Sequence, residues 1–249
     1  MMLMARDLSR ALDPVLLARD CGIEPDPWQS KLLRDRPQRS LLNCSRQSGK
    51  STVTALLALW TAIFEAPALV AIVSPSQRQS AEMFRSLMMF YSKLDGAPAL
   101  NMESVLRAEF ETGSRILALP GTEKTVRGLA NVNLVIIDEA GRVEDDLLAA
   151  VRPFLAVSSG KLVALSTPAG KRGFFYESWI GDGDWTRIKV AASDCPRITK
   201  EFLAEELKEL GAQRFSEEYE LAFLDPDSAV FSTAIIDAAF TNDVVPLWM

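Results

Sequence analysis

The stretch Leu41–Val53, LLNCSRQSGKSTV, decides the fold. Two apolar residues lead into a turn of small and polar residues, and Gly-Lys-Ser then opens a run of apolar and β-branched residues. The stretch matches a phosphate-binding loop (Gly, four residues of any kind, Gly, Lys, Ser or Thr) except that Cys44 replaces the first glycine. Gly49 lets backbone amides turn toward phosphate oxygens, and Lys50 adds a positive charge. The loop therefore predicts a triphosphate site, and the alternative is a chance Gly-Lys-Ser at a helix start.

A pair of acidic residues supports this interpretation. The apolar run LVIIDEA ends in Asp138 and Glu139, at the carboxyl end of an expected parallel strand, where ligands bind in open α/β sheets. We expect Asp138 and the Ser51 hydroxyl to hold Mg²⁺, and Glu139 to orient the water that attacks the γ-phosphate of ATP. Alone, such a pair would more often cap a helix. Together with the loop, it predicts nucleotide hydrolysis.

Apolar strands and amphipathic helices alternate along the chain. We expect helices over 49–64, 76–94 and 143–157, and strands over 39–44, 68–75, 104–111, 114–120, 133–140, 161–168 and 185–192, with Thr112-Gly113 as a hairpin turn. Continuous Val, Ile and Leu runs favour a mostly parallel central sheet flanked by helices. From this pattern together with the loop and the acidic pair, we expect the α/β fold of P-loop NTPases of the ASCE type. Residues 1–198 are expected to form this ATPase core with an N-terminal helical segment. Residues 199–249 would form a small helical lid or linker, with Gly211 between two short helices.

The composition excludes several classes of site. The chain has 249 residues, no histidine, a net charge of −6 and three separated cysteines, Cys21, Cys44 and Cys195. Catalytic triads that need an imidazole are therefore excluded, a zinc site is disfavoured, and a reducing cytoplasm is expected. No apolar run approaches the ~20 residues that span a bilayer, so we expect no membrane contact. Because the chain is acidic, any contact with nucleic acid should be local.

Two further motifs flank the expected site. Trp28-Gln29 precedes the first strand, where the Gln29 amide can read the adenine edge while Trp28 packs beneath the base. The alternative is a core tryptophan at a helix start. Ser166-Thr167-Pro168 follows the next expected strand, and its hydroxyls can sense the γ-phosphate. The alternative there is a capping turn.

Taken together, these motifs resemble the ATPase domain of the large terminase subunit of tailed bacteriophages. The resemblance covers nearly the whole chain and rests on WQ, SRQSGKS, VRGLANVNLVIIDEA, STP and RFSEEYELAFLDPDSAVF. That family commonly lacks the first loop glycine, so Cys44 is a family-type departure. The resemblance implies a motor that pumps double-stranded DNA into a procapsid in the host cytoplasm. Its implied partners are the portal protein, the small terminase subunit and other copies in a ring, pentameric in related motors.

The resemblance also suggests site residues. The nucleotide-binding set would include the loop residues Ser45, Arg46, Gln47, Ser48, Gly49, Lys50, Ser51 and Thr52. An arginine from a neighbouring subunit would complete the site, and Arg127 is the first candidate, because a guanidinium adds positive charge to the transferring phosphoryl group. The alternative for Arg127 is a partner within its own subunit. Arg46 competes for a catalytic role in cis, or else holds the shape of the loop.

The chain also differs from full-length relatives, which carry a metal-dependent nuclease domain. The acidic residues near the end of this sequence are too few and too loosely placed for that cluster: Asp225, Asp227, Asp237 and Asp243. We therefore expect an isolated motor domain without nuclease activity. Candidate DNA-contacting cations are Arg78, Arg85, Lys124, Lys171 and Arg172, and for each the alternative is an ordinary solvated charge.

Two other functions remain open. A helicase-like DNA-dependent ATPase is the first, although such enzymes usually need a second motor lobe or a hexamer. A nucleotide-dependent binding switch that does not hydrolyse ATP is the second, and Glu139 argues against it. In the favoured mechanism, helices from Thr199 to Phe223 act as a lid that moves after phosphate release.

Overall fold

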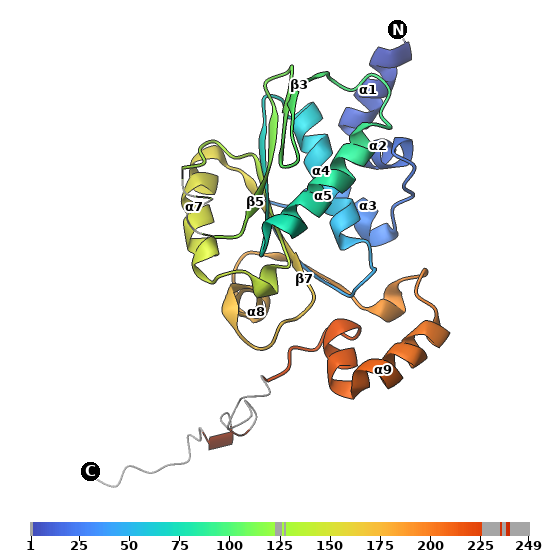
Figure 1. The fold of residues 1–249 in the computed structure, drawn as a ribbon, viewed down its shortest axis with the longest axis vertical. Coiled ribbons are helices and arrows are strands. Elements are labelled where there is room, and N and C mark those ends of the chain that lie inside the picture. The colour runs from blue at the N-terminus through green and yellow to red at the C-terminus, as the bar shows by residue number, and fades with distance from the viewer. Residues whose placement is uncertain (1, 123–125, 127, 226–234, 236–237, 240–249) are drawn as a thin grey trace, which may run out of the picture.

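The computed structural model describes residues 2–122, 126, 128–225, 235 and 238–239, and these form a sheet with helices on both faces (Figure 1). The strands are β1 (Arg39–Cys44), β2 (Leu69–Ser74), β3 (Leu100–Glu103), β4 (Arg107–Phe110), β5 (Arg115–Pro120), β6 (Leu134–Asp138), β7 (Lys161–Ser166) and β8 (Thr186–Val190). The helices are α1 (Met2–Leu12), α2 (Pro14–Asp20), α3 (Pro27–Asp35), α4 (Lys50–Phe64), α5 (Gln77–Tyr91), α7 (Asp146–Ser158), α8 (Gly173–Ile180) and α9 (Lys200–Glu218), with short 3₁₀ turns η1 (Ala140–Arg142) and η2 (Ala192–Asp194).

The sheet is mostly parallel, which confirms the predicted fold class. Its strand order is β3-β4-β5-β2-β6-β7-β1-β8, and β5, β2, β6, β7, β1 and β8 run parallel to one another. β3 and β4 add an antiparallel edge, and β4 joins β5 through the predicted hairpin. β1 lies between β7 and β8, and β6 lies between β2 and β7. The carboxyl ends of β1 and β6 therefore meet at the same edge of the sheet.

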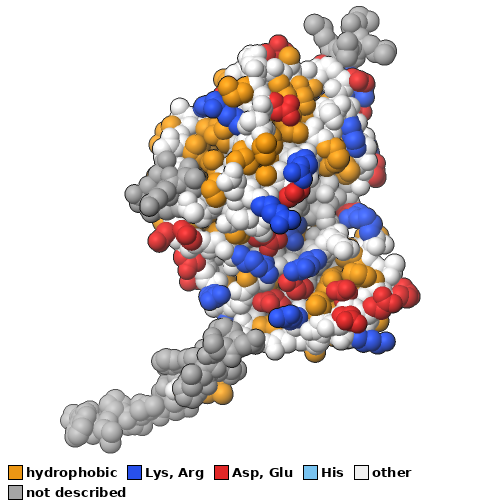
Figure 2. All heavy atoms as spheres, viewed as in Figure 1, with side chains coloured by type: hydrophobic (Ala, Val, Ile, Leu, Met, Phe, Trp, Pro, Cys, Tyr) orange, Lys and Arg blue, Asp and Glu red, His pale blue; other side chains and the backbone are white. Residues whose placement is uncertain are grey.

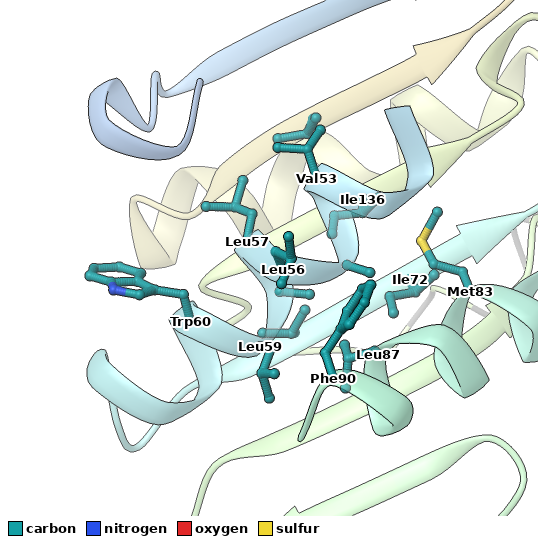
Figure 3. Packing of buried hydrophobic residues seen from close by; sticks show 14 of the residues in the cluster. Val53, Leu56, Leu57, Leu59, Trp60, Ile72, Met83, Leu87, Phe90 and Ile136 are labelled. Carbon is teal, nitrogen blue, oxygen red and sulfur yellow. The ribbon is translucent and has the colours of Figure 1, made fainter. Parts of the chain in front are cut away.

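Helix α4 forms the centre of the core. Its side chains are apolar on nearly every side, because it packs against the sheet, α2 and α5 (Figure 3). Leu56, Leu57 and Leu59 are almost fully buried, and they meet Ile72 of β2 and residues of α5. A helix buried on all sides gives the loop before it a rigid base. A second apolar cluster covers the opposite face of the sheet, under α7 and α8.

Cys44 is the last residue of β1 and not part of the loop turn. It is fully buried in the core, and desolvation raises the pKa of its thiol to about 12, so the side chain stays neutral. The loop begins only at Ser45, whose backbone N–H still donates to Val190 of β8. The departure from the motif therefore lies in the strand, where the Cys44 side chain packs in the core, and not in the turn.

Helix α9 lies apart from the sheet (Figure 1), and its carboxyl end is fixed to η2 and α8. Its helical geometry breaks at Gly211 (φ 75°, ψ 162°), the residue that the sequence placed between two helices. The chain then returns to the core: the N–H of Ala192 donates to the carbonyl of Tyr219 at 2.9 Å. Phe223 packs against the rings of three residues in α8, Phe175, Tyr176 and Trp179.

Two elements were not predicted. β3 shows no buried face, and α8 is short and rich in aromatic residues, so neither produces a clear periodic pattern. In the described part of the chain, no helix combines the length and apolar character that crossing a membrane requires.

Candidate active site

The loop between β1 and α4 is a tight turn with a buried inner side. Ser45 and Ser48 are fully buried, and the Ser48 hydroxyl donates to the carbonyl of Ser45 at 2.8 Å. Gln47 and Gly49 take positive φ angles of 58° and 86°. A Cβ at position 49 would lie 2.5 Å from Nε2 of Gln29, so the Gln29 side chain would have to shift, and the positive φ itself favours glycine there. Ser45 and Ser48 therefore stabilise the turn from its buried side.

The start of α4 offers donors to an anion. Gly49 is the N-cap, and having no side chain it cannot cap the amides of the first turn itself. These amides and the positive end of the helix dipole suit phosphate oxygens. Ser51 and Thr52 lie in this first turn, both half-buried. The arrangement fits a bound triphosphate.

Lys50 and the acidic pair meet across the edge of the sheet. Lys50 is only 8% exposed, and its Nζ lies 3.9 Å from Oε1 of Glu139. Glu139 follows β6 in the left-handed conformation, with φ 49°, which is uncommon outside glycine. Strained backbone of this kind is often found at functional sites.

When ionised, Asp138 places a negative charge in a buried position, where a cation would stabilise it. It is 8% exposed, and its Oδ1 accepts the N–H of Glu139 at 3.0 Å. Burial, and then the charge of Glu139, raise its pKa to about 6, while Lys50 acts in the opposite direction. Among the described residues, no side chain forms an ion pair with Asp138. A hard divalent cation would offset this charge, so the residues present fit Mg²⁺ held by Asp138 and Ser51.

The two hydroxyls at the carboxyl end of β7 contact η1, the turn that follows Glu139. Ser166 and Thr167 are both buried. The Ser166 hydroxyl accepts the N–H of Gly141 at 3.2 Å, and the Thr167 hydroxyl accepts Nη1 of Arg142 at 3.1 Å. The Ser166-Thr167-Pro168 motif is therefore connected through η1 to Glu139, as a sensor of the γ-phosphate would need to be. The same hydrogen bonds also fit the alternative, a capping turn.

Arg142 was not predicted as a site residue, yet it contacts three elements. Besides Thr167, its Nη1 lies 2.7 Å from Oε2 of Glu139, and its Nη2 lies 3.6 Å from Oε1 of Glu218 in α9. Its position three residues after Glu139 was the only signal in the sequence.

Arg46 points to α9 in this structure. Its guanidinium makes a bidentate pair with Glu218 at 2.9 and 3.0 Å, and its backbone N–H donates to the carbonyl of Glu218 at 3.4 Å. Of the two roles weighed for Arg46, this geometry matches the one that holds the loop in place. Arg127, the other catalytic arginine suggested, lies outside the described residues, as does Lys124.

Gln29 joins α3 to the loop. Its Oε1 accepts the N–H of Asp26 at 2.8 Å, and its Nε2 donates to the carbonyl of Gly49 at 3.1 Å. Reading adenine would require at least one of these bonds to be shared or exchanged. Trp28 packs partly buried against the core, and its indole N–H is buried without a partner among the described residues. A second link between the start of α3 and the loop was not predicted from the sequence. Arg197 donates to both carboxylate oxygens of Asp26 and to the carbonyl of Ser48.

The described candidates for DNA contact differ in their surroundings. Arg85 pairs with Glu82 at 2.8 Å and Lys171 with Asp225 at 3.2 Å, whereas Arg78 and Arg172 are exposed. Figure 2 shows Lys and Arg side chains across the middle of one face, with acidic side chains among and below them. Contact of an acidic chain with phosphates would depend on local cations such as these.

Comparisons with known proteins give matches over most of the chain. A family model described as the terminase large subunit, T4likevirus-type, N-terminal, matches residues 41–237. The chain is 26% identical over 191 residues to a probable terminase large subunit of Enterobacteria phage P7, covering 67% of this chain and 38% of that protein. The chain therefore spans about two fifths of the length of the curated relative.

Solved structures share the fold. The large terminase ATPase domain of Thermus phage P74-26 superposes with a TM-score of 0.72 at 21% identity, covering 83% of this chain and 97% of that one. The HK97 bacteriophage large terminase gives 0.66 at 19% identity, covering 80% of this chain and 50% of that one. The large terminase of a thermophilic bacteriophage, solved with ADP, gives 0.62 at 10% identity, with 86% and 53% covered.

Proposed function

Since the chain belongs to the T4likevirus-type N-terminal family of terminase large subunits, we propose that it is an ATP-hydrolysing motor domain that moves double-stranded DNA into a procapsid. One observation carries the enzymatic part: Lys50, at the base of a phosphate-type loop, lies 3.9 Å from the carboxylate of Glu139 across the sheet edge. A binding switch would not need an acid at that place.

Each side chain has a distinct task in this proposal. The amides of the α4 first turn and Lys50 bind the phosphates, and Glu139 orients the attacking water and accepts its proton. Asp138 and Ser51 would hold Mg²⁺, which neutralises charge on the phosphate oxygens when bound. Ser166 and Thr167 connect the site to η1, so loss of the γ-phosphate would change the position of η1. The loop set predicted from the sequence, with Trp28 and Gln29 at the base, completes the proposed nucleotide site.

The proposed partners follow from the family. They are double-stranded DNA, the portal protein, the small terminase subunit and further copies of the chain in a ring, with a pentamer as the expected size. The place of action would be the host cytoplasm, at the portal of the procapsid. Arg127 is proposed to act on the nucleotide of a neighbouring subunit. Because such an arginine can contribute ~10³–10⁵ in rate, the isolated domain should turn over slowly.

The test is phosphate release from Mg·ATP by the wild type and by Glu139→Gln, with binding of a fluorescent ATP analogue measured in parallel. We expect kcat to fall by at least about 10²-fold while the dissociation constant changes little. Glu144→Gln, which changes an exposed carboxylate five residues further on, is the matched control and should behave like the wild type. Unchanged turnover in Glu139→Gln would show that the catalytic residue lies elsewhere.

The motor part needs its own measurement. Turnover of the wild type should rise when linear double-stranded DNA is added, and forked DNA should remain paired. Strand separation on the fork would instead favour the helicase-like alternative.

A further inference from the structure

We propose that a cleft at the amino edge of the sheet is a docking site for an acidic peptide segment of another protein, one that carries an apolar side chain between its carboxylates. The cleft has a volume of about 820 Å³, and its lining includes Arg39, Leu148, Arg152, Leu155, Leu162 and Trp185. It is called the amino-edge cleft below. Because the proposed ATP site lies at the carboxyl edge of the same sheet, this inference goes beyond the proposed function.

The amino-edge cleft lies where two helices meet the starts of two strands. Helices α7 and α8 cover the same face of the sheet (Figure 1), and both contribute lining residues. The first residue of β1 and the second residue of β7 lie beside them in the lining. The phosphate loop follows the other end of β1, so a ligand in this cleft would not meet the nucleotide.

Two side chains that donate to backbone carbonyls fix the walls of the cleft. Nε2 of Gln38 donates to the carbonyls of Ser159 at 2.9 Å and Gly160 at 2.6 Å, which joins the end of α7 to the start of β1. Arg187 in β8 donates to carbonyls at the end of α8 and before β8, those of Ser178, Trp179, Gly181, Gly183 and Trp185. Walls held in this way are formed before a ligand binds, which lowers the ordering cost of binding.

The cleft presents two arginines without partners. Arg39 and Arg152 are both exposed, and neither forms an ion pair or a side-chain hydrogen bond with another residue that the structure describes. Of the described residues that line the cleft, none is acidic. The whole chain carries 33 Asp and Glu against 27 Lys and Arg, so this lining has the opposite charge balance to the protein. Guanidinium groups bind carboxylates through paired hydrogen bonds, so the charge of the cleft complements an acidic ligand.

The rest of the lining is largely apolar. Leu148, Leu155 and Leu162 contribute aliphatic side chains, and the half-buried Trp185 adds an aromatic one. The indole N–H of Trp185 makes no hydrogen bond within the described part of the chain, so it can donate to a ligand. Trp and Arg are the side chains that most often dominate binding between proteins. The lining therefore suits a ligand that combines an apolar side chain with carboxylates.

This chemistry favours a peptide over a nucleic acid. A duplex would bring a regular row of phosphates to the surface and little apolar area to bury against the leucines. Two exposed acids, Asp182 and Asp184, flank the lining residue Gly183 and would repel such a row. A peptide can place its carboxylates at the two arginines alone and bury the side chain between them.

The test is a selection of ligands from a random dodecapeptide library on the immobilised full chain, followed by fluorescence-polarisation titration of the enriched peptides. Sequences with at least two Asp or Glu around a Leu, Phe or Trp should be enriched. Their dissociation constants should rise with NaCl concentration, because salt screens exposed ion pairs.

Substitutions in the lining locate the binding. Arg39→Ala and Arg152→Ala should each weaken it about two- to fivefold, the size expected for one exposed ion pair. Ala156→Glu places a carboxylate at an exposed lining position and should weaken binding at least about tenfold through like-charge repulsion. Arg78→Ala, which removes an exposed arginine at the start of α5, is the matched control and should bind like the wild type.

The inference is overturned if no peptide is enriched, if the enriched peptides are not acidic, or if Arg39→Ala and Arg152→Ala bind them as tightly as the wild type. Two other results would assign the cleft to a different occupant and overturn it as well. One is binding of a short DNA duplex, without peptide binding, that is lost in Arg152→Ala. The other is a wild-type dimer in sedimentation velocity that becomes a monomer in Ala156→Glu. Peptide binding needs no nucleotide, so a failure to release phosphate would overturn the proposed function and leave this result unaffected.

Discussion

Replacing Asp138 by asparagine should stabilise the protein in the absence of nucleotide. Asp138 is 8% exposed, and its pKa is raised from 3.8 to about 6 by burial first and by Glu139 second. The neutral form of such a group stabilises the fold, so its contribution is complete below pH 3.8 and is lost as pH rises through about 6. At 1.36 kcal/mol per unit, the ionised carboxylate costs about 3 kcal/mol at neutral pH.

Asparagine removes this cost and keeps a useful bond, because its Oδ1 can still accept the N–H of Glu139. We expect the free energy of unfolding to rise by about 2–3 kcal/mol at pH 7.5, which corresponds to about 5–10 °C in Tm for a domain of this size. The gain should fall to about half near pH 5, where the wild-type side chain is mostly protonated in the folded state.

The assay is thermal and urea unfolding in buffer with EDTA, at pH 7.5 and pH 5. Asp182→Asn, a change at an exposed carboxylate, is the matched control and should leave Tm nearly unchanged. Addition of Mg·ATP should stabilise the wild type and have a much weaker effect on Asp138→Asn. If Asp138→Asn melts at or below the wild-type temperature at pH 7.5, Asp138 is not a buried charge awaiting a cation.

Three substitutions test the loop and its support. Gly49→Ala should cost about 1–3 kcal/mol and weaken ATP-analogue binding, because position 49 has φ 86° and a Cβ would meet Gln29; unaltered binding would contradict the loop geometry. Cys44→Gly restores the missing glycine of the motif but should lower stability by about 1–3 kcal/mol without tighter binding, since it removes a buried side chain from a strand. Leu57→Ala should cost about 2–5 kcal/mol in urea unfolding, whereas Leu207→Ala, at 43% exposure, should cost much less; equal losses would mean that α4 is not the centre of the core.

The sequence predicted the main sheet well because its central strands are buried on both faces. β2, β6 and β7 are continuous apolar runs bounded by polar residues, so their limits are visible without the structure. β3 was not predicted because its side chains are mostly exposed, and α8 was not predicted because eight residues are too few to show helical periodicity.

The phosphate loop and the acidic pair were also visible, since each is a local pattern. The structure brings Lys50 and Glu139 together as expected, and their chemical roles remain predictions. The contacts of Arg142, Arg197 and Glu218 were not visible. Arg46 and Glu218 are 172 positions apart, and a lone glutamate in a helix rich in glutamates gives no sign of its partner.

The carboxyl end of α9 is attached to η2 and α8, and this restricts how the helix can move. The bond between Ala192 and Tyr219 and the packing of Phe223 fix the chain just after the helix, while η2 precedes it. A free swing of the whole segment would break these contacts. Displacement of the amino half of α9 should therefore appear as a change of angle at Gly211, and the fixed carboxyl half limits its range.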